Sequence, residues 1–127
     1  MRILLGTLVI WLASAVSTMA ATKYALSGVP ITLFQASSTN PDCSANGIPT
    51  IRVTQDPQHG RITITRGGVF AYFSPSNARS ACNKRRVPGV IARYVSQRGY
   101  TGTDTAAIEV FFPSGQAGRT SYFISVR

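Results

Sequence analysis

Acidic side chains and histidine are scarce in this sequence. Its 127 residues include four Asp and Glu side chains, two cysteines and one histidine, His59. A zinc site takes about four ligands, and a thiol nucleophile needs a histidine partner. Two cysteines and one histidine therefore argue against a zinc site and against a catalytic thiol. A Ca²⁺ site takes roughly six to eight oxygen ligands, more than four scattered acids supply. We therefore expect no metal and no cofactor.

Long apolar runs are also missing, except near the start. Met1-Arg2 is followed by an apolar stretch at 3–13 and by small residues as far as Ala21. A positive start, a short apolar core and a small-residue tail are typical of a secretory signal peptide. We predict a signal peptide at 1–20 with cleavage after Ala20, or, as second choice, after Ala15. The alternative is an uncleaved anchor helix, but a bilayer takes roughly 20 apolar residues to cross.

The remaining 107 residues, 21–127, are enough for one domain. The formal net charge is +9, or +8 without Arg2, and eleven of the thirteen basic residues are arginine. Such a balance attracts polyanions, and arginine favours planar, bidentate contacts with phosphate or carboxylate. A basic proteome or simple solvation explains the same charge.

The cysteines, Cys43 and Cys82, both lie in the part predicted to be exported. In an oxidising compartment an isolated pair is most simply one disulfide. Closing a loop of about 40 residues stabilises a fold by roughly 3–4 kcal/mol in the chain-entropy model. We predict a periplasmic or secreted protein with this bond.

Strand-length runs alternate with turn residues along the rest of the chain, and no stretch has a helical period. This pattern predicts an all-β, Ig-like sandwich of about seven strands. The runs lie at residues 23–26, 31–35, 50–54, 61–66, 69–73, 90–95, 106–112 and 119–127.

The alternation and the turn residues also predict local features of the fold. Pro30 suits an edge strand that changes sheets after 23–26. Ile62 and Ile64 are expected to face inward, and Gly67-Gly68 to form a primed hairpin turn. Residues 74–88 are polar without a period and predict a long loop pinned by the disulfide. The buried side of the last run carries Tyr122, Ile124 and Val126.

A corner is predicted at 99–104, which reads Gly-Tyr-Thr-Gly-Thr-Asp. Gly99 and Gly102 allow backbone conformations that a Cβ forbids, so the ring of Tyr100 can fold back over the end of the core. The carboxylate of Asp104 can accept hydrogen bonds from turn amides.

Two segments together carry a family resemblance. They are Pro57-Gln58-His59-Gly60 and, after an aromatic strand, the 99–104 corner with its following strand pair. Their order resembles bacterial Ig-like, cadherin-like domains, which often occur in tandem in large surface proteins. The likeness covers 51–126.

The resemblance implies a seven-stranded sandwich that serves as a spacer, adhesion or ligand-binding module without a catalytic site. This chain departs from the pattern as a lone domain with a cysteine pair, a basic insert at 74–88 and no acidic clusters at strand ends. Single-domain versions with a cysteine pair look like small exported proteins of Gram-negative bacteria.

The residues give little support to an enzymatic function. His59 is the side chain expected to titrate near neutrality, but its motif offers no nucleophile. We interpret Pro57, His59 and Gly60 as structural turn residues. Asp104 and Glu109 could form a carboxylate pair for glycoside cleavage, but Glu109 alternates outward and Asp104 belongs to the corner.

The best functional candidate is a basic loop at 79–86. It holds Arg79, Lys84, Arg85 and Arg86 close to a disulfide that partly immobilises it, with Arg93 and Arg98 as possible additions if the loop folds over the neighbouring strand. Pre-ordering reduces the entropy lost when a polyanion binds. The expected ligands are anionic envelope polysaccharide or lipid headgroups and not nucleic acid; a solvated charge cluster is the alternative.

Exposed sheet edges suggest a different class of function. A strand edge can pair with a partner protein of the envelope and so act in adhesion or protein–protein interaction. Pro30 and the terminal arginines resemble edge protection, which ranks this hypothesis second.

Overall fold

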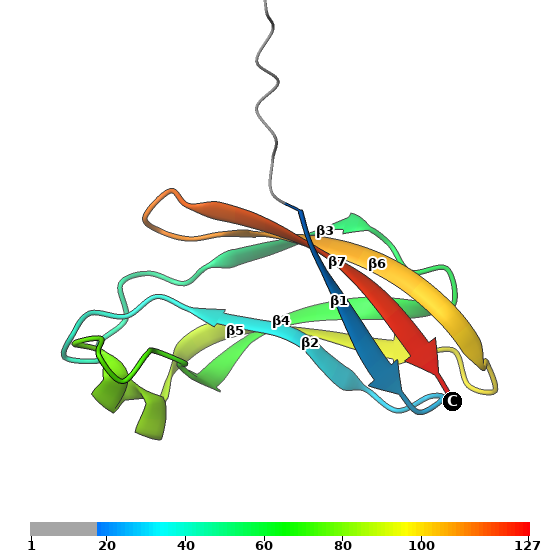
Figure 1. The fold of residues 1–127 in the computed structure, drawn as a ribbon, viewed down its shortest axis with the longest axis horizontal. Coiled ribbons are helices and arrows are strands. Elements are labelled where there is room, and N and C mark those ends of the chain that lie inside the picture. The colour runs from blue at the N-terminus through cyan, green and yellow to red at the C-terminus, as the bar shows by residue number, and fades with distance from the viewer. Residues whose placement is uncertain (1–17) are drawn as a thin grey trace, which may run out of the picture.

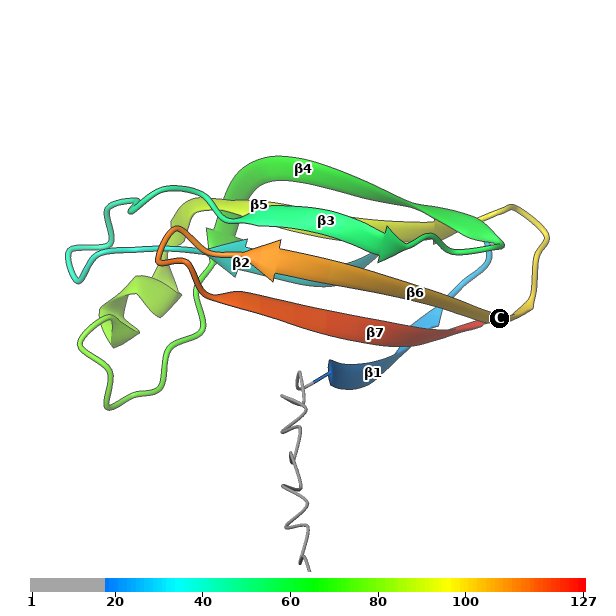
Figure 2. The same ribbon diagram turned by 90° about the horizontal axis from the view of Figure 1, so that it is seen from above.

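The computed structural model describes residues 18–127 and shows two β-sheets packed face to face (Figures 1 and 2). The predicted signal peptide at 1–20 lies outside the described residues, apart from 18–20, which begin the first strand. The strands are β1 (Thr18–Ala25), β2 (Ile31–Ser37), β3 (Thr50–Gln55), β4 (Gly60–Phe70), β5 (Arg86–Ser96), β6 (Gly102–Phe111) and β7 (Ala117–Val126).

One sheet has four strands in the order β1-β7-β6-β3, and the other has three in the order β2-β5-β4. β1 runs parallel to β7, and every other pair is antiparallel. β1 and β2 lie in different sheets, so the chain changes sheets around Pro30, as predicted. The predicted all-β sandwich of about seven strands is confirmed.

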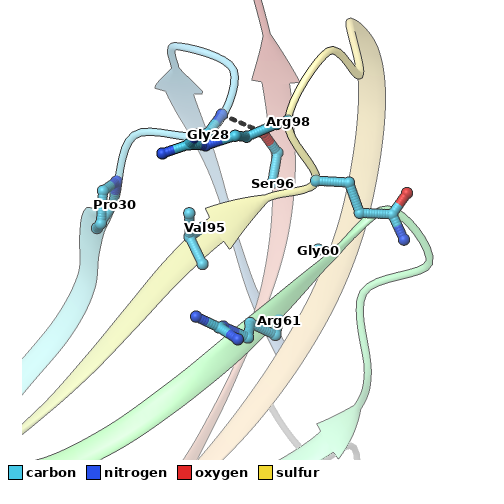
Figure 3. A pocket seen from close by; sticks show the side chains of 8 residues that line it. Gly28, Pro30, Gly60, Arg61, Val95, Ser96 and Arg98 are labelled. Carbon is cyan, nitrogen blue, oxygen red and sulfur yellow. Dashed lines mark hydrogen bonds between the residues drawn. The ribbon is translucent and has the colours of Figure 1, made fainter.

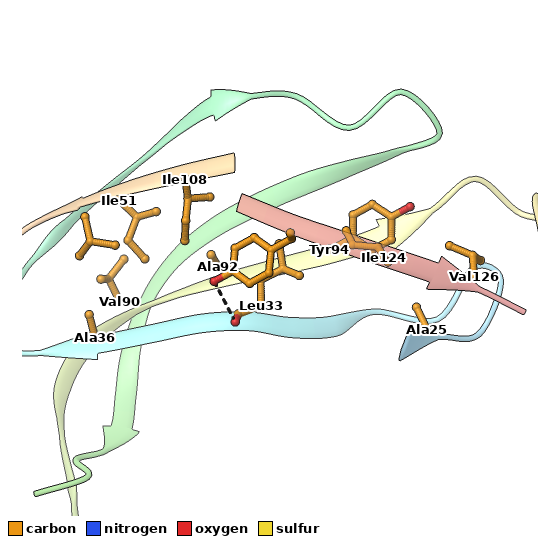
Figure 4. Packing of buried hydrophobic residues seen from close by; sticks show 12 residues of the cluster. Ala25, Leu33, Ala36, Ile51, Val90, Ala92, Tyr94, Ile108, Ile124 and Val126 are labelled. Carbon is orange, nitrogen blue, oxygen red and sulfur yellow. Dashed lines mark hydrogen bonds between the residues drawn. The ribbon is translucent and has the colours of Figure 1, made fainter. Parts of the chain in front are cut away.

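The main core lies between the sheets and is built from alternating side chains of both (Figure 4). From the four-stranded sheet come Ile51, Ile108, Val110 and the predicted Tyr122, Ile124 and Val126; from the other come Leu33, Ala36, Val90, Ala92 and Tyr94. Tyr94, Ile108 and Ile124 are completely buried.

The predicted hairpin at Gly67-Gly68 is wrong. β4 runs without interruption from Gly60 to Phe70 and pairs with β5 throughout, including Gly67 with Gly89 and Gly68 with Pro88. A type I′ turn needs positive φ at both central residues and a type II′ turn at the first, and neither glycine has positive φ. The expected strands at 61–66 and 69–73 are therefore one strand, and residues 71–73 lie beyond it.

The predicted loop at 74–88 is too long by three residues, because β5 begins at Arg86. The loop contains a short 3-10 helix, η1 (Ser80–Lys84). Ile62 and Ile64 share the core face with their partners Tyr94 and Ala92, but only Ile62 packs on the core. Ile64 is 37% exposed, because β4 is an edge strand.

A second apolar cluster covers the opposite face of β5. Val87 and Ile91 lie on that face because they alternate with Pro88, Val90 and Ala92. Val69 and Ala71 join them, and Cys43 and Phe73 pack against the group. One end of the outer face of the β2-β5-β4 sheet is thus covered by the loops that the cysteines join. Within residues 18–127 there is no helix of the length and hydropathy needed to cross a membrane.

Candidate functional site

The two segments that carried the family resemblance form one structural unit around Asp104. Its carboxylate accepts hydrogen bonds from the amides of Gln58 and His59, both at 3.0 Å, and from its neighbour Thr105 at 2.9 Å. The hydroxyl of Tyr94 donates a fourth, of 2.7 Å. Asp104 is buried, so these four donors replace the water it loses. This carboxylate holds the turn before β4 against the start of β6.

The ring of His59 stacks on the ring of Tyr100, with centroids 4.0 Å apart and planes inclined by 5°. Tyr100 packs on the main core and donates its hydroxyl to the carbonyl of Thr103 at 2.6 Å. Both glycines of the corner have positive φ, Gly99 at 85° and Gly102 at 135°. The predicted turn residues, with half-buried Pro57 and with Gly60 at the start of β4, therefore gather at one end of the sandwich.

The predicted disulfide joins Cys43 to Cys82. Two of the predicted anion-binding residues add polar ties between the same loops. Nε of Arg79 donates to the carbonyl of Thr39 at 2.8 Å, and Nη2 of Arg85 donates to the carbonyl of Asp42 at 2.9 Å. Hydrogen bonds from Ser44 and, to a smaller extent, the Arg85 charge lower the pKa of Asp42.

The predicted basic cluster is not one patch. Arg79, Lys84 and Arg85 lie with the disulfide at one end of β5, whereas Arg98 follows the other end. An eleven-residue strand spans about 35 Å. Arg86 alternates with Val87, so it points to the other side of the sheet; its guanidinium lies 5.5 Å from the ring centre of Phe70.

The β2-β5-β4 sheet carries arginines and no acidic residue. On its outer face, beyond the covered end, lie Arg93, which pairs with Thr63, and Arg61, which pairs with Val95. Both arginines are exposed, and Arg93 donates to the hydroxyl of Thr65 at 3.3 Å. With exposed Arg98 they form what we call the arginine face, defined by Arg61, Arg93 and Arg98.

A hollow of about 500 Å³ lies at the end of the arginine face (Figure 3). Arg61 and Arg98 lie on either side of the Val95 side chain there, with Pro30 beyond it. Another hollow, of about 340 Å³, is lined by Arg66 and Arg86 together with Gly67, Gly68 and Pro88. Each of these hollows holds two arginines and no carboxylate.

Arg61 and Arg66 are not among the residues predicted from the sequence to bind anions. The signal for Arg61 was present, because a residue that alternates with inward-facing Ile62 must face outward. That Arg61 and Arg98 line the same hollow depends on how the turn after β5 folds, and no local sequence pattern determines that fold.

Compared with protein-family models, with curated proteins and with solved structures, the chain has no significant match. The resemblance to bacterial Ig-like domains therefore stays a prediction, and the fold assignment depends on the structure.

Proposed function

We propose that this chain is a small exported, non-catalytic module of the Ig-like kind, and that its arginine face binds anionic polymers of the bacterial envelope. The observation that carries the proposal is the β2-β5-β4 sheet, which bears Arg61 and Arg93 on its exposed outer face and has no acidic residue in any of its strands.

The four acidic residues lie elsewhere in the fold. Asp104 is buried among its four donors, and Glu109, on the other sheet, lies between its strand partners Arg52 and Arg119. Asp42 belongs to the disulfide loop and Asp56 to the turn between β3 and β4. The positive potential of the arginine face is therefore not offset by carboxylates of its own sheet.

The basic loop extends this surface. Phe73 and Cys43 pack on Val69, Val87 and Ile91 of the same outer face, and the disulfide ties Cys43 to Cys82 of the basic loop. Arg79 and Arg85 donate to backbone carbonyls, which leaves their positive charges in place. A long anionic chain could thus contact the loop at one end and Arg98 at the other. The disulfide fits an extracytoplasmic location, where envelope polysaccharide and lipid headgroups are the abundant polyanions.

Two variants of equal charge test the proposal. Arg61→Gln/Arg93→Gln/Arg98→Gln removes the arginine face, and Arg52→Gln/Arg119→Gln/Arg127→Gln removes three exposed arginines beside the other sheet. On a heparin column we expect the first variant to elute at clearly lower salt than the second. Equal elution of the two, or no retention of the wild type at low salt, would reject the proposal. Binding to anionic and to neutral vesicles extends the test to lipid headgroups. The Lys84/Arg85/Arg86 triple alanine extends it to the basic loop.

A second candidate function is edge pairing with an envelope protein. β4 is an eleven-residue edge strand, and within the part of the chain that the structure describes one side of its backbone has no neighbouring strand. Long open edges favour association with another strand. Size-exclusion chromatography at two salt concentrations separates the two functions, because oligomers that form through backbone pairing persist in salt whereas polyanion binding weakens.

A further inference from the structure

The hollow at the end of the arginine face has the features of a seat for one anionic group. Its volume of about 500 Å³ falls within the roughly 300–1,000 Å³ usual for small-molecule sites. It lies between the β1–β2 turn and the β5–β6 turn, beside the first residues of β4. The main lining residues are Gly28, Pro30, Gly60, Arg61, Val95 and Arg98.

Hydrogen bonds fix the two turns that border the hollow. The amide of Gly28 donates to the hydroxyl of Ser96 at 2.9 Å, the bond drawn in Figure 3, and Ser96 is itself buried. The amide of Gly99 donates to the hydroxyl of Ser27 at 2.9 Å. The Ser27 hydroxyl in turn donates to the carbonyl of Gln97 at 3.4 Å. Because these bonds cross from one turn to the other, the rim is ordered before any ligand arrives.

Glycine at position 28 makes room for Arg98. A Cβ there would lie 2.9 Å from Cγ of Arg98, and the φ of Gly28 is +72°, a region that other residues rarely adopt. The aliphatic part of Arg98 therefore packs directly on the turn backbone. A side chain seated in this way has less rotamer freedom to lose when its guanidinium binds a ligand.

The chemistry of the lining defines the ligand class. Two guanidinium groups with no carboxylate among the lining residues favour phosphate, sulfate or carboxylate oxygens. Val95 and Pro30 add apolar surface between and beside the two charges. This combination suits a compact oxyanion attached to a small body with both polar and apolar faces, such as a sugar.

We propose that this hollow binds a single sugar unit bearing a phosphate, sulfate or carboxylate group, and that Arg61 and Arg98 contact the anionic group. The proposal deepens the proposed function and depends on it, because the sugar unit would be the end or a branch of the polymer that the arginine face binds. Arg93 and the basic loop would then contact the rest of that polymer.

Amide NMR spectra of the oxidised protein provide the test, with glucose 6-phosphate and glucuronate as probes and uncharged glucose as control. We expect both anionic sugars to shift the amide signals of Gly28, Gly60, Gln97 and Arg98, and glucose to leave them unchanged. Arg61→Gln and Arg98→Gln should each weaken binding about tenfold, the effect expected from losing one charge-assisted contact. Shifts spread over both sheets, or equal shifts with glucose, would overturn the proposal.

A matched pair of glycine variants tests the geometry. Gly28→Ala and Gly115→Ala both place a side chain at positive φ, 72° and 90°, but only the first collides with Arg98. We expect Gly28→Ala to weaken glucose 6-phosphate binding and Gly115→Ala to leave it at the wild-type value. Equal affinity in the two variants would overturn the proposal.

The two proposals fail in different ways. If retention on heparin depends on the arginine face but the anionic sugars cause no localised shifts, the proposal for the hollow is rejected and the proposed function stands. Loss of selective heparin retention would remove both. Displacement of bound glucose 6-phosphate by heparin would support a polysaccharide as the source of the sugar unit, and displacement by phosphatidylglycerol vesicles, which carry no sugar, would overturn the assignment of a sugar unit.

Discussion

The hydroxyl of Tyr94 donates a 2.7 Å hydrogen bond to Oδ2 of Asp104, and both residues are buried. Tyr94 lies in β5 of one sheet and Asp104 in β6 of the other, so the bond joins the two layers across the core. The same carboxylate binds the amides of Gln58 and His59. One acidic side chain thus connects both sheets and the turn before β4.

Removing this hydroxyl should cost more than removing that of another buried tyrosine. Tyr94→Phe takes a donor from a buried carboxylate, and hydrogen bonds to charged groups contribute about 1.5–3 kcal/mol. Tyr122→Phe is the matched control, because its hydroxyl donates to the neutral carbonyl of Leu33 at 3.3 Å. For that variant we expect about 0.5–1.5 kcal/mol. Urea denaturation measures both, and an equal loss in the two variants would contradict the role given to Asp104.

Stability should fall in alkaline solution because of the same tyrosines. Burial, and then the hydrogen bond to Asp104, raise the pKa of Tyr94 well above its usual value, and burial raises the pKa of Tyr122. The folded chain therefore retains phenolic protons that the unfolded chain releases near pH 10. The free energy of unfolding should be unaffected by these groups below that pH and should fall above it, by up to about 1.4 kcal/mol per pH unit for each tyrosine.

Denaturant titrations between pH 8 and pH 11 check this dependence. Tyr94→Phe should decline less steeply than the wild type above pH 10, because it lacks one of the two shifted groups. Parallel curves for the two proteins would show that Tyr94 does not contribute.

Glycines of adjacent strands should differ sharply in their tolerance of a side chain. A Cβ at Gly67 would meet only Cδ1 of Ile91, at 3.9 Å, so Gly67→Ala should leave stability unchanged or raise it by about 0.4–1 kcal/mol. A Cβ at Gly89 would lie 2.5 Å from both the carbonyl oxygen of Ala36 and Cγ2 of Val69. Gly89→Ala should therefore cost about 1–3 kcal/mol. Thermal unfolding of both variants measures these changes in stability. A large loss of stability in Gly67→Ala would favour the hairpin turn over the continuous strand.

Loss of the disulfide should destabilise the domain unevenly. The bond closes a loop with a sequence separation of 39, for which chain entropy gives about 4 kcal/mol. In Cys43→Ala/Cys82→Ala we expect faster amide exchange at residues 38–47 and 71–85, since Cys43 packs on the cluster that fastens them. Hydrogen exchange with mass spectrometry resolves the two regions from the main core. Uniform acceleration across all strands would contradict this division.

Side-chain alternation was enough to predict most of the fold. Tyr122, Ile124 and Val126 are buried as their spacing required, and Pro30 marks the change of sheet. The predicted hairpin turn at Gly67-Gly68 was wrong because the same dipeptide occurs in tight turns and in extended edge strands. Only pairing with Gly89 and Pro88, about twenty residues away, selects the second. Local sequence contains no information on that pairing.

The candidate site was harder to predict than the fold. Counting nearby cations joined Arg86 to Arg85 and Arg79, although strand alternation sends Arg86 to the other side of the sheet. Arg61 and Arg98 are 37 positions apart and line the same hollow only because the turn after β5 folds against the turn after β1. Tertiary contacts of this kind cannot be read from spacing.

Arg79 and Arg85 attach to the carbonyls of Thr39 and Asp42, so the loops that carry the two sulfur atoms are also fastened without them. When the sulfur bond is cut, these contacts should keep the thiols near each other in an otherwise native molecule. Reoxidation would then be fast and independent of protein concentration, and capture of either thiol by a foreign partner would be rare. The cysteine pair would therefore serve as a lasting structural bond and would make a poor redox sensor.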